Sequence, residues 1–253
     1  MQLFDLTGRT ALVTGSSGGI GYTLAEGLAG AGARIIVNGR NAEKLGAAAA
    51  RLREARCDVI ELPFDVTDVA AVRAAIDGFE AAHGPIDILV NNAGMTHRSP
   101  LEDFPPEMFD RIMRTNVHSI FHVSQAVARH MIPRGRGKMI NIASVQTALS
   151  RPGIAPYCAS KGAVANLTKG MATDWAPKGL NCNAIAPGYF ETELTAALVA
   201  DAEFTAWVGK RTPAGRWGKV EELIGAAIFL SSDASGFVHG HTLFVDGGMT
   251  SCL

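Results

Sequence analysis

The chain has 253 residues, of which 47% are hydrophobic and 19% are charged. This composition is ordinary for a globular protein and argues against a disordered, fibrous or disulfide-stapled chain. The formal net charge of −1 supplies no field that would attract phosphate backbones or anionic lipid, so we expect no nucleic-acid partner and no membrane partner.

Four cysteines are scattered along the chain, with no CxxC pair and no Cys/His cluster at metal-ligand spacing. They favour a reducing compartment and predict no metal site. The first residues lack the basic and apolar regions of a signal peptide, and no window reaches about 18 uninterrupted apolar residues. We therefore expect a cytoplasmic protein.

Short β-branched runs alternate with longer alanine-rich stretches, a pattern typical of parallel strands joined by crossover helices. The strand runs are apolar without alternation, as expected when helices cover both faces of a sheet. The predicted fold class is therefore α/β, with one domain over residues 1–253 and a doubly wound, seven-stranded parallel sheet. The predicted strands are residues 10–14, 34–38, 59–62, 86–90, 138–142, 181–186 and 242–245. The predicted helices are residues 20–31, 42–55, 69–83, 107–131, 157–175 and 220–231.

The stretch from about 188 to 219 lacks a clean strand or crossover signal. It is long for a loop, and insertions of this kind are usually functional lids or disordered. Its aromatic residues Tyr189, Phe190, Phe204 and Trp207 favour a partly helical flap over the substrate.

A glycine-rich segment, Thr14-Gly15-Ser16-Ser17-Gly18-Gly19-Ile20-Gly21, follows the first predicted strand and precedes a helix. Glycines here would let the chain turn tightly and admit a pyrophosphate against the backbone. The helix N-terminus would then face the phosphates. The spacing is GxxxGxG rather than GxGxxG, so a tight turn without a ligand remains an alternative.

The second predicted strand ends near Asn38 and Arg40, where an acidic residue would accept the ribose hydroxyls of NAD. None is present, and the guanidinium of Arg40 could grip a 2′-phosphate, so NADP(H) is favoured over NAD(H). The alternative is a solvated arginine ahead of a helix capped by Asn41. Asp65 and Val66 would lie near the adenine, although Asp65 could be only a turn or cap residue.

The candidate catalytic residues are Ser144, after the fifth strand, and Tyr157 and Lys161, which share a helix face at i and i+4. A free phenol has a pKa near 10, and a nearby ammonium would stabilise the phenolate. Tyr157 could then act as general acid or base. An isolated Tyr-x-x-x-Lys is usually a surface pair, so the context decides.

That context resembles the short-chain dehydrogenase/reductases over essentially the whole chain. The motifs that carry the resemblance are residues 14–21, Asn91-Asn92-Ala93-Gly94, Asn116, Ser144, Tyr157-Cys158-Ala159-Ser160-Lys161 and Pro187-Gly188. The resemblance implies a Rossmann-type sheet with helices on both faces, a dinucleotide cofactor and a homotetramer.

The same resemblance implies a role for each catalytic residue. Ser144 holds the carbonyl oxygen, and Tyr157 donates the proton. Lys161 binds the nicotinamide ribose and lowers the tyrosine pKa, while Asn116 positions a water in the proton relay. The expected cofactor contacts are Gly15, Ser17, Gly19, Ile20, Gly21, Asn38, Arg40, Asp65, Val66, Asn92, Ala93, Gly94, Tyr157, Lys161, Pro187, Gly188 and Thr192. Many NADP-preferring relatives carry Arg or Lys where Gly18 stands, so Arg40 would have to supply the preference unaided.

Longer stretches, residues 125–138, 151–157, 186–190 and 210–218, resemble members of the family that interconvert 5-keto-D-gluconate and D-gluconate. They imply a sugar acid substrate, whose carboxylate needs a cation when it leaves water. Arg98 and Arg151 are the candidate cations, and either could instead form a surface or intersubunit ion pair. Gln146 could bind a substrate hydroxyl or tie down its own loop. The expected substrate contacts are Arg98, Ser144, Gln146, Arg151 and Tyr157.

Two other functions are compatible with parts of this pattern. A reductase of other carbonyls, such as 3-oxoacyl thioesters or small ketones, would use the same catalytic residues, because these do not depend on what the flap admits. A non-catalytic NADP(H)-binding scaffold or sensor would not need Asn116, Ser144, Tyr157 and Lys161 together.

Overall fold

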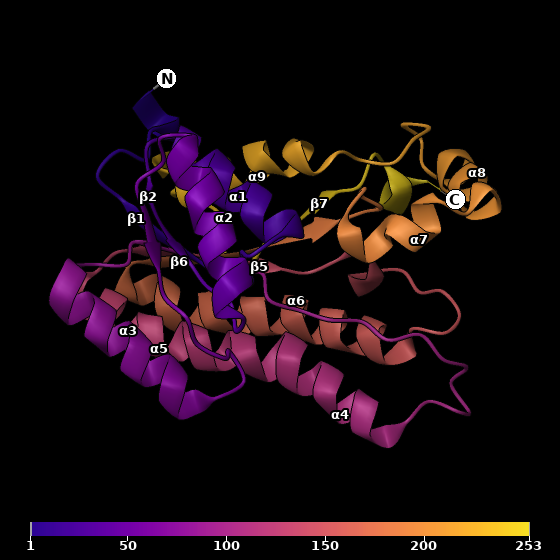
Figure 1. Ribbon diagram of the computed structural model, residues 1–253, viewed down its shortest axis with the longest axis horizontal. Helices are drawn as coiled ribbons and strands as arrows, with labels where there is room; N and C mark the ends of the chain where they lie inside the picture. Colours follow the sequence, from indigo (N-terminus) through magenta and orange to yellow (C-terminus); the bar gives the residue numbers. More distant parts are fainter. Residues whose placement is uncertain (1, 253) are drawn as a thin grey trace.

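A computed structural model describes residues 2–252, which form one three-layer α/β domain (Figure 1). In these residues seven parallel strands make one sheet in the order β3-β2-β1-β4-β5-β6-β7. The strands are β1 Thr10–Val13, β2 Arg34–Val37, β3 Val59–Glu61, β4 Ile88–Asn91, β5 Gly137–Ile142, β6 Leu180–Pro187 and β7 Thr242–Val245. The predicted fold class and single domain are confirmed.

The order of the strands reverses at β1, which pairs with β2 on one side and with β4 on the other. Successive crossovers therefore leave β1 in opposite directions, and a crevice opens at the carboxyl ends of β1 and β4. In open α/β sheets this switch point is where ligands bind.

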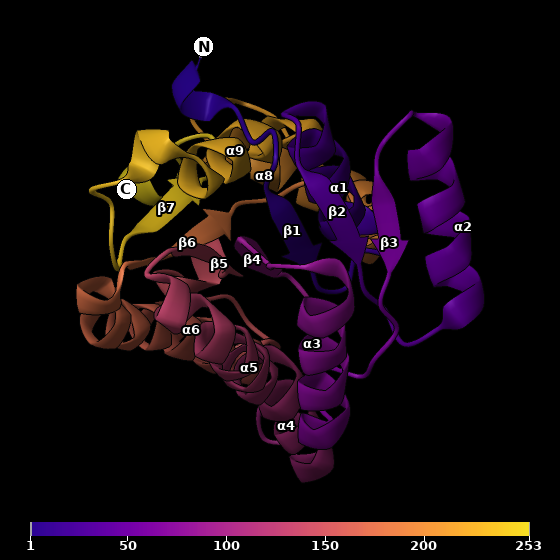
Figure 2. The same cartoon turned by 90° about the vertical axis from the view of Figure 1, so that its left-hand side faces the viewer.

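Helices cover both faces of the sheet, as Figure 2 shows end-on. Leu24, Leu45 and Leu223 belong to the apolar core on one face, and Ile76 and Val123 belong to the core on the other. The first face carries α1 Gly19–Gly30, α2 Ala42–Glu54 and α9 Ile224–Ser231, and the second carries α3 Val69–His83, α5 Ser119–Arg134 and α6 Ala155–Trp175. Both faces are therefore buried, which explains the unbroken apolar strands.

Some predicted boundaries were wrong. The helix expected over 107–131 consists of α4 Pro106–Met113, a π-helical turn Arg114–His118, and α5. Hydrophobic periodicity cannot register the extra residue of a π turn, a feature that is frequent at functional sites. The helix expected from 220 begins as a 3-10 turn, Val220–Leu223, and β4 starts at Ile88 rather than at 86.

The segment 188–219 carries two short helices, α7 Ala196–Val199 and α8 Ala202–Arg211. Its base is closed by a parallel bridge between Phe190 and Gly218. Figure 1 shows α7 and α8 beyond the sheet, at the end of the molecule opposite α3. We call residues 188–219 the flap segment.

In the turn before β6, the backbone of Gly179 packs directly against the backbone of Gly135. Gly179 has φ 85°, and a Cβ there would collide with the carbonyl oxygen of Gly135. We expect Gly179→Ala to lower the free energy of unfolding by about 2–4 kcal/mol, because strain and overpacking add. Gly170→Ala is the matched control, since an added Cβ on this exposed residue of α6 meets nothing within 4 Å. It should stabilise by about 0.5–1 kcal/mol. Equal urea midpoints for the two variants would contradict this account.

Candidate active site

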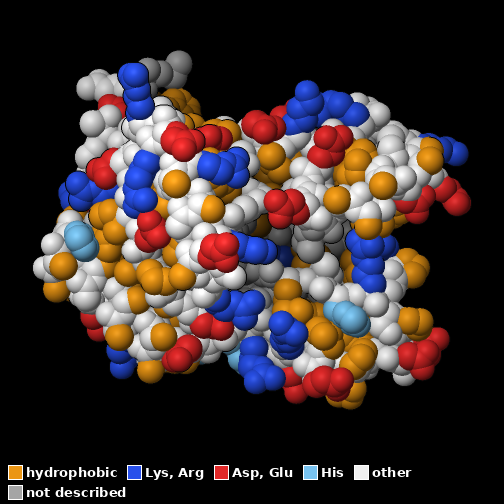
Figure 3. All heavy atoms as spheres, viewed as in Figure 1, with side chains coloured by type: hydrophobic (Ala, Val, Ile, Leu, Met, Phe, Trp, Pro, Cys, Tyr) orange, Lys and Arg blue, Asp and Glu red, His pale blue; other side chains and the backbone are white. Residues whose placement is uncertain are grey.

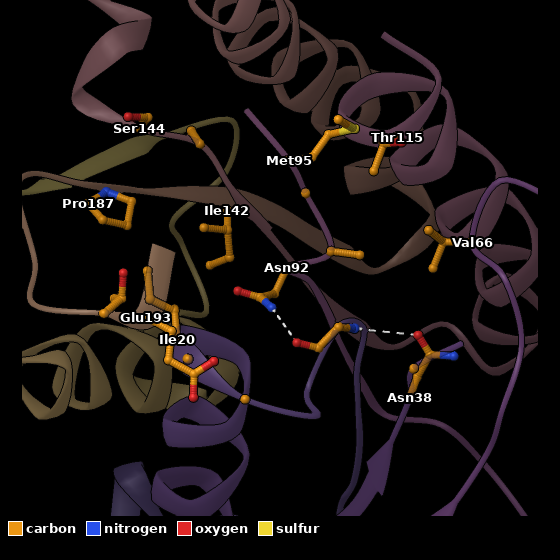
Figure 4. Close-up of a pocket in the computed structure, with 18 of the residues that line it drawn as sticks. Ile20, Asn38, Val66, Asn92, Met95, Thr115, Ile142, Ser144, Pro187 and Glu193 are labelled. Carbon is orange, nitrogen blue, oxygen red and sulfur yellow. Dashed lines mark hydrogen bonds between the residues drawn. The ribbon is translucent and has the colours of Figure 1, made fainter. Parts of the chain in front are cut away.

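A cavity of about 480 Å³ opens at the carboxyl ends of the central strands. Figure 3 shows the hollow near the middle of one face, with acidic and basic side chains at its rim, and Figure 4 shows the interior. The predicted cofactor residues that line it are Gly15, Gly19, Ile20, Asn38, Arg40, Asp65, Val66, Asn92, Ala93, Gly94, Tyr157, Lys161, Pro187, Gly188 and Thr192. Ser144 lines it as well. Within the described part of the chain, the predicted residues that do not line it are Ser17, Gly21, Arg98, Asn116, Gln146 and Arg151.

The glycine-rich loop lies against the loop that follows β4. A Cβ on Gly15 would stand 2.9 Å from the Cα of Ala93, and a Cβ on Gly21 would collide with the side-chain amide of Asn92. The Nδ2 of Asn92 donates hydrogen bonds to the carbonyls of Thr14 and Gly15, both at 3.0 Å. The two loops therefore meet with no room for a side chain between them.

The start of α1 offers unpaired donors to the cavity. Gly18 occupies the N-cap position and provides no side-chain cap. The hydroxyl of Ser17 is buried and has no hydrogen-bond partner among residues 2–252. Free N–H groups at a helix N-terminus beside an unpartnered hydroxyl match the chemistry of a bound phosphate.

Just after β2, Arg40 lies beside Asp65, with 3.5 Å between the Nη1 of Arg40 and the Oδ2 of Asp65. Burial acts to raise the pKa of Asp65, but hydrogen bonds from Thr67 and the charge of Arg40 hold it below its usual value. Asn38 braces the loops: its Nδ2 donates to the carbonyls of Leu62 and Phe64, at 3.0 and 3.1 Å. Its side-chain oxygen accepts from the glycine-rich loop (Figure 4).

Tyr157 and Lys161 project from the first turns of α6. The Nζ of Lys161 lies 5.7 Å from the ring centroid of Tyr157 and donates to the carbonyl of Ile142 at 2.6 Å. Burial lowers the pKa of Lys161 to about 8. Burial also raises the pKa of Tyr157, and the nearby Ser144 hydroxyl acts in the opposite direction. The expected lowering of the Tyr157 pKa by Lys161 is therefore not seen, because burial dominates and the ammonium faces a carbonyl.

Asn116 sits in the π turn and is fully buried. Its Oδ1 accepts from the N–H of Met95 at 2.8 Å, and its Nδ2 donates to the carbonyl of Met95 and the hydroxyl of Ser160. The side chain thus fixes the cavity wall at Met95 to the helix that carries Tyr157. The water-positioning role expected of Asn116 stays a prediction.

The two candidate substrate cations, Arg98 and Arg151, lie on loops that contact each other, and neither lines the cavity. Burial lowers the pKa of Arg98, and the charge of Arg151 lowers it further. The N–H of Ser99 donates to the carbonyl of Gly153 at 3.1 Å, which ties the two arginine-bearing loops together. Among residues 2–252 no carboxylate lies within 4.0 Å of either guanidinium. Two neighbouring cations thus stand without a counter-charge from this part of the chain.

Sequence reasoning missed several residues of the cavity wall. These are Gly18, Gly39, Phe64, Thr67, Met95, Thr115, Ile142, Ala143, Phe190, Glu193 and Thr195. Ile142 and Ala143 could have been found, because they end a strand just before Ser144. Phe190, Glu193 and Thr195 lie at the start of the flap segment, where no motif marks individual contacts.

No helix within residues 2–252 is long and apolar enough to cross a membrane. In the same residues no group of three or more His, Cys, Asp or Glu side chains could hold a metal ion.

Comparison with known proteins places this site in a family. The sequence model described as enoyl-(acyl carrier protein) reductase matches residues 15–250. The chain is also 61% identical over 252 residues to a gluconate 5-dehydrogenase of Gluconobacter oxydans (strain 621H), covering 100% of this chain and 98% of that protein. The chain belongs to the short-chain dehydrogenase/reductase family. The predicted family is thereby confirmed.

Other members of the short-chain dehydrogenase/reductase family give the same picture. A 5-keto-D-gluconate 5-reductase of Escherichia coli (strain K12) is 52% identical over 248 residues, covering 98% of each protein. A crystal structure of a gluconate 5-dehydrogenase from Burkholderia cenocepacia J2315, in complex with NADP and tartrate, is 60% identical. It superposes with a TM-score of 0.97 over 100% of this chain and 99% of that one.

Proposed function

We propose that this short-chain dehydrogenase/reductase is an NADP(H)-dependent oxidoreductase that interconverts 5-keto-D-gluconate and D-gluconate. The observation that carries the proposal is one cavity lined by the glycine-rich loop and Arg40 as well as by Ser144, Tyr157 and Lys161. The identity to gluconate 5-dehydrogenases supports the substrate.

The cavity residues fit a bound dinucleotide. The glycine-rich loop and the unpartnered Ser17 hydroxyl would hold the pyrophosphate, and Arg40 the 2′-phosphate. Asp65 and Val66 would lie along the adenine. The loops after β4 and β6 would line the cofactor through Asn92, Ala93, Gly94, Pro187, Gly188 and Thr192. When bound, the cofactor supplies or accepts the hydride.

The chain's own residues handle the proton. In reduction, Ser144 donates a hydrogen bond to the carbonyl oxygen and Tyr157 gives its phenolic proton to the same atom. The raised pKa of Tyr157 keeps the phenol protonated at neutral pH, ready to donate. Lys161, with a pKa of about 8, then returns a proton to the phenolate and can exchange its own with water. Oxidation runs the same steps in reverse.

The substrate assignment follows from charge. Arg98 and Arg151 have no carboxylate within 4.0 Å in residues 2–252, so a carboxylate from the substrate would compensate them. Gln146 would bind a hydroxyl, and the flap segment would cover the sugar acid. A neutral ketone or acyl chain gains nothing from two adjacent cations. We therefore favour the sugar acid over the other carbonyls.

We also propose a location and an assembly. The four cysteines are all unpaired in residues 2–252, which suits a reducing compartment, so we propose a cytoplasmic location that cell fractionation can test. A homotetramer is proposed because the family resemblance implies one, and because α4 and α5 expose Phe109 and Phe121.

Light scattering tests the assembly. At assay concentration we expect the mass of four chains of 26.6 kDa each, because exposed aromatic faces of α4 and α5 would be buried between copies. The mass of one chain under the same conditions would contradict the tetramer.

The Tyr157→Phe variant separates catalysis from mere binding. Removing the hydroxyl removes the proton donor and leaves the cavity shape, so turnover should fall on the order of 10²–10⁴-fold. NADPH affinity, measured by fluorescence titration, should stay within about twofold of wild type. A wild-type protein that binds NADPH but turns over no carbonyl would instead support a scaffold or sensor.

The Arg40→Ala variant tests the cofactor preference. Charge-assisted hydrogen bonds contribute about 1.5–3 kcal/mol, so KM for NADPH should rise about tenfold or more while KM for NADH hardly changes. Arg53→Ala is the matched control, because Arg53 on α2 pairs with Glu61 of β3 and does not line the cavity in the described chain. Equal changes for both cofactors would show that Arg40 does not read the 2′-phosphate.

A further inference from the structure

Four aromatic side chains of the flap segment pack into one cluster. The ring centroid of Tyr189 lies 5.6 Å from Phe204, 5.8 Å from Trp207 and 5.6 Å from Trp217. Phe204 in turn lies 5.3 Å from Trp207 and 6.1 Å from Trp217. The cluster holds α8 against the residues that follow β6, at the end of the molecule where the arginine-bearing loops run (Figure 1).

Phe204 also faces a cation that belongs to another part of the chain. The guanidinium carbon of Arg151 lies 5.4 Å from the ring centroid of Phe204. Arg151 is half-buried in the loop that precedes α6, whereas Phe204 is on α8. A guanidinium over an aromatic face is attracted by the ring quadrupole, and more strongly where water is excluded.

The contact between Arg151 and Phe204 opposes the tendency of Arg98 and Arg151 to move apart. Two like charges repel, and each long side chain gains entropy by moving apart into water. The hydrogen bond from Ser99 to Gly153 fixes the two loops but not the two guanidiniums. Within residues 2–252 no carboxylate pairs with Arg151, so the ring of Phe204 is the group seen to hold its guanidinium.

We propose that Phe204 is a positioning residue for the substrate carboxylate, because it holds Arg151 beside Arg98 from the flap segment. The proposal rests on the proposed sugar acid function. A carboxylate that bridges the two guanidiniums would offset their repulsion, and the ring of Phe204 holds Arg151 where such a bridge can form. A neutral carbonyl compound cannot do this, and the flap segment thereby contributes to the selection of anionic substrates.

The measurement is a double-mutant cycle on KM for 5-keto-D-gluconate at saturating NADPH. Phe204→Leu should raise KM about five- to tenfold, with kcat within about twofold, because it removes the ring face but not the arginine. Phe204→Tyr keeps an aromatic ring at this position, so its KM should stay close to the wild-type value. In an Arg151→Leu background, Phe204→Leu should have no further effect on KM, because the two residues act through one contact.

A purely structural role for Phe204 gives different results. In that case the fold-increases in KM caused by Phe204→Leu and Arg151→Leu would multiply in the double variant. That outcome overturns the inference even if both variants have lower melting temperatures. A Phe204→Leu enzyme with wild-type KM also overturns it. If the wild-type protein does not reduce 5-keto-D-gluconate with NADPH, the proposed function itself fails and this inference fails with it.

Discussion

The contact between the loop after β1 and the loop after β4 determines where everything else in the site can lie. A Cβ on Gly15 would stand 2.9 Å from the Cα of Ala93, and Asn92 donates to two carbonyls of the glycine-rich loop. Because these loops meet at the reversal of strand order, their contact sets the floor of the crevice. It also leaves the first turn of α1 at that crevice, through Gly19 and Ile20, with the unpartnered Ser17 hydroxyl buried just behind it.

At the end of the crevice that holds Tyr157 and Lys161, burial shifts the pKa values of both side chains. It raises the pKa of Tyr157 and lowers that of Lys161 to about 8, so both side chains favour their neutral forms. A phenolate left after proton donation has the higher affinity for a proton, and the neighbouring ammonium gives one up readily. In the proposed reduction, a proton transfer from Lys161 to Tyr157 would therefore need no additional acid.

Much of this arrangement could be predicted from the sequence, because it depends on local pattern. Apolar strand runs predict the sheet, and the spacing of Tyr157 and Lys161 predicts a shared helix face. The π turn around Asn116 could not be predicted, since no residue type or motif marks the place where a helix takes up an extra residue. The pairing of Arg151 with Phe204 joins a loop to a helix far along the chain, and only folding brings them together. The direction of the Tyr157 pKa depends on burial, which the motif does not record.

Fold and catalytic residues are shared by reductases of many carbonyls, so in the proposed function the arginine pair and the flap segment select the substrate. The most direct test is a set of initial rates for the purified protein with NADPH or NADH and three substrates: 5-keto-D-gluconate, an acetoacetyl thioester and a simple ketone. The account predicts the highest kcat/KM for NADPH with 5-keto-D-gluconate, by about tenfold or more, because two cations would bind its carboxylate. Turnover of the thioester or the ketone with none of the keto acid would contradict it.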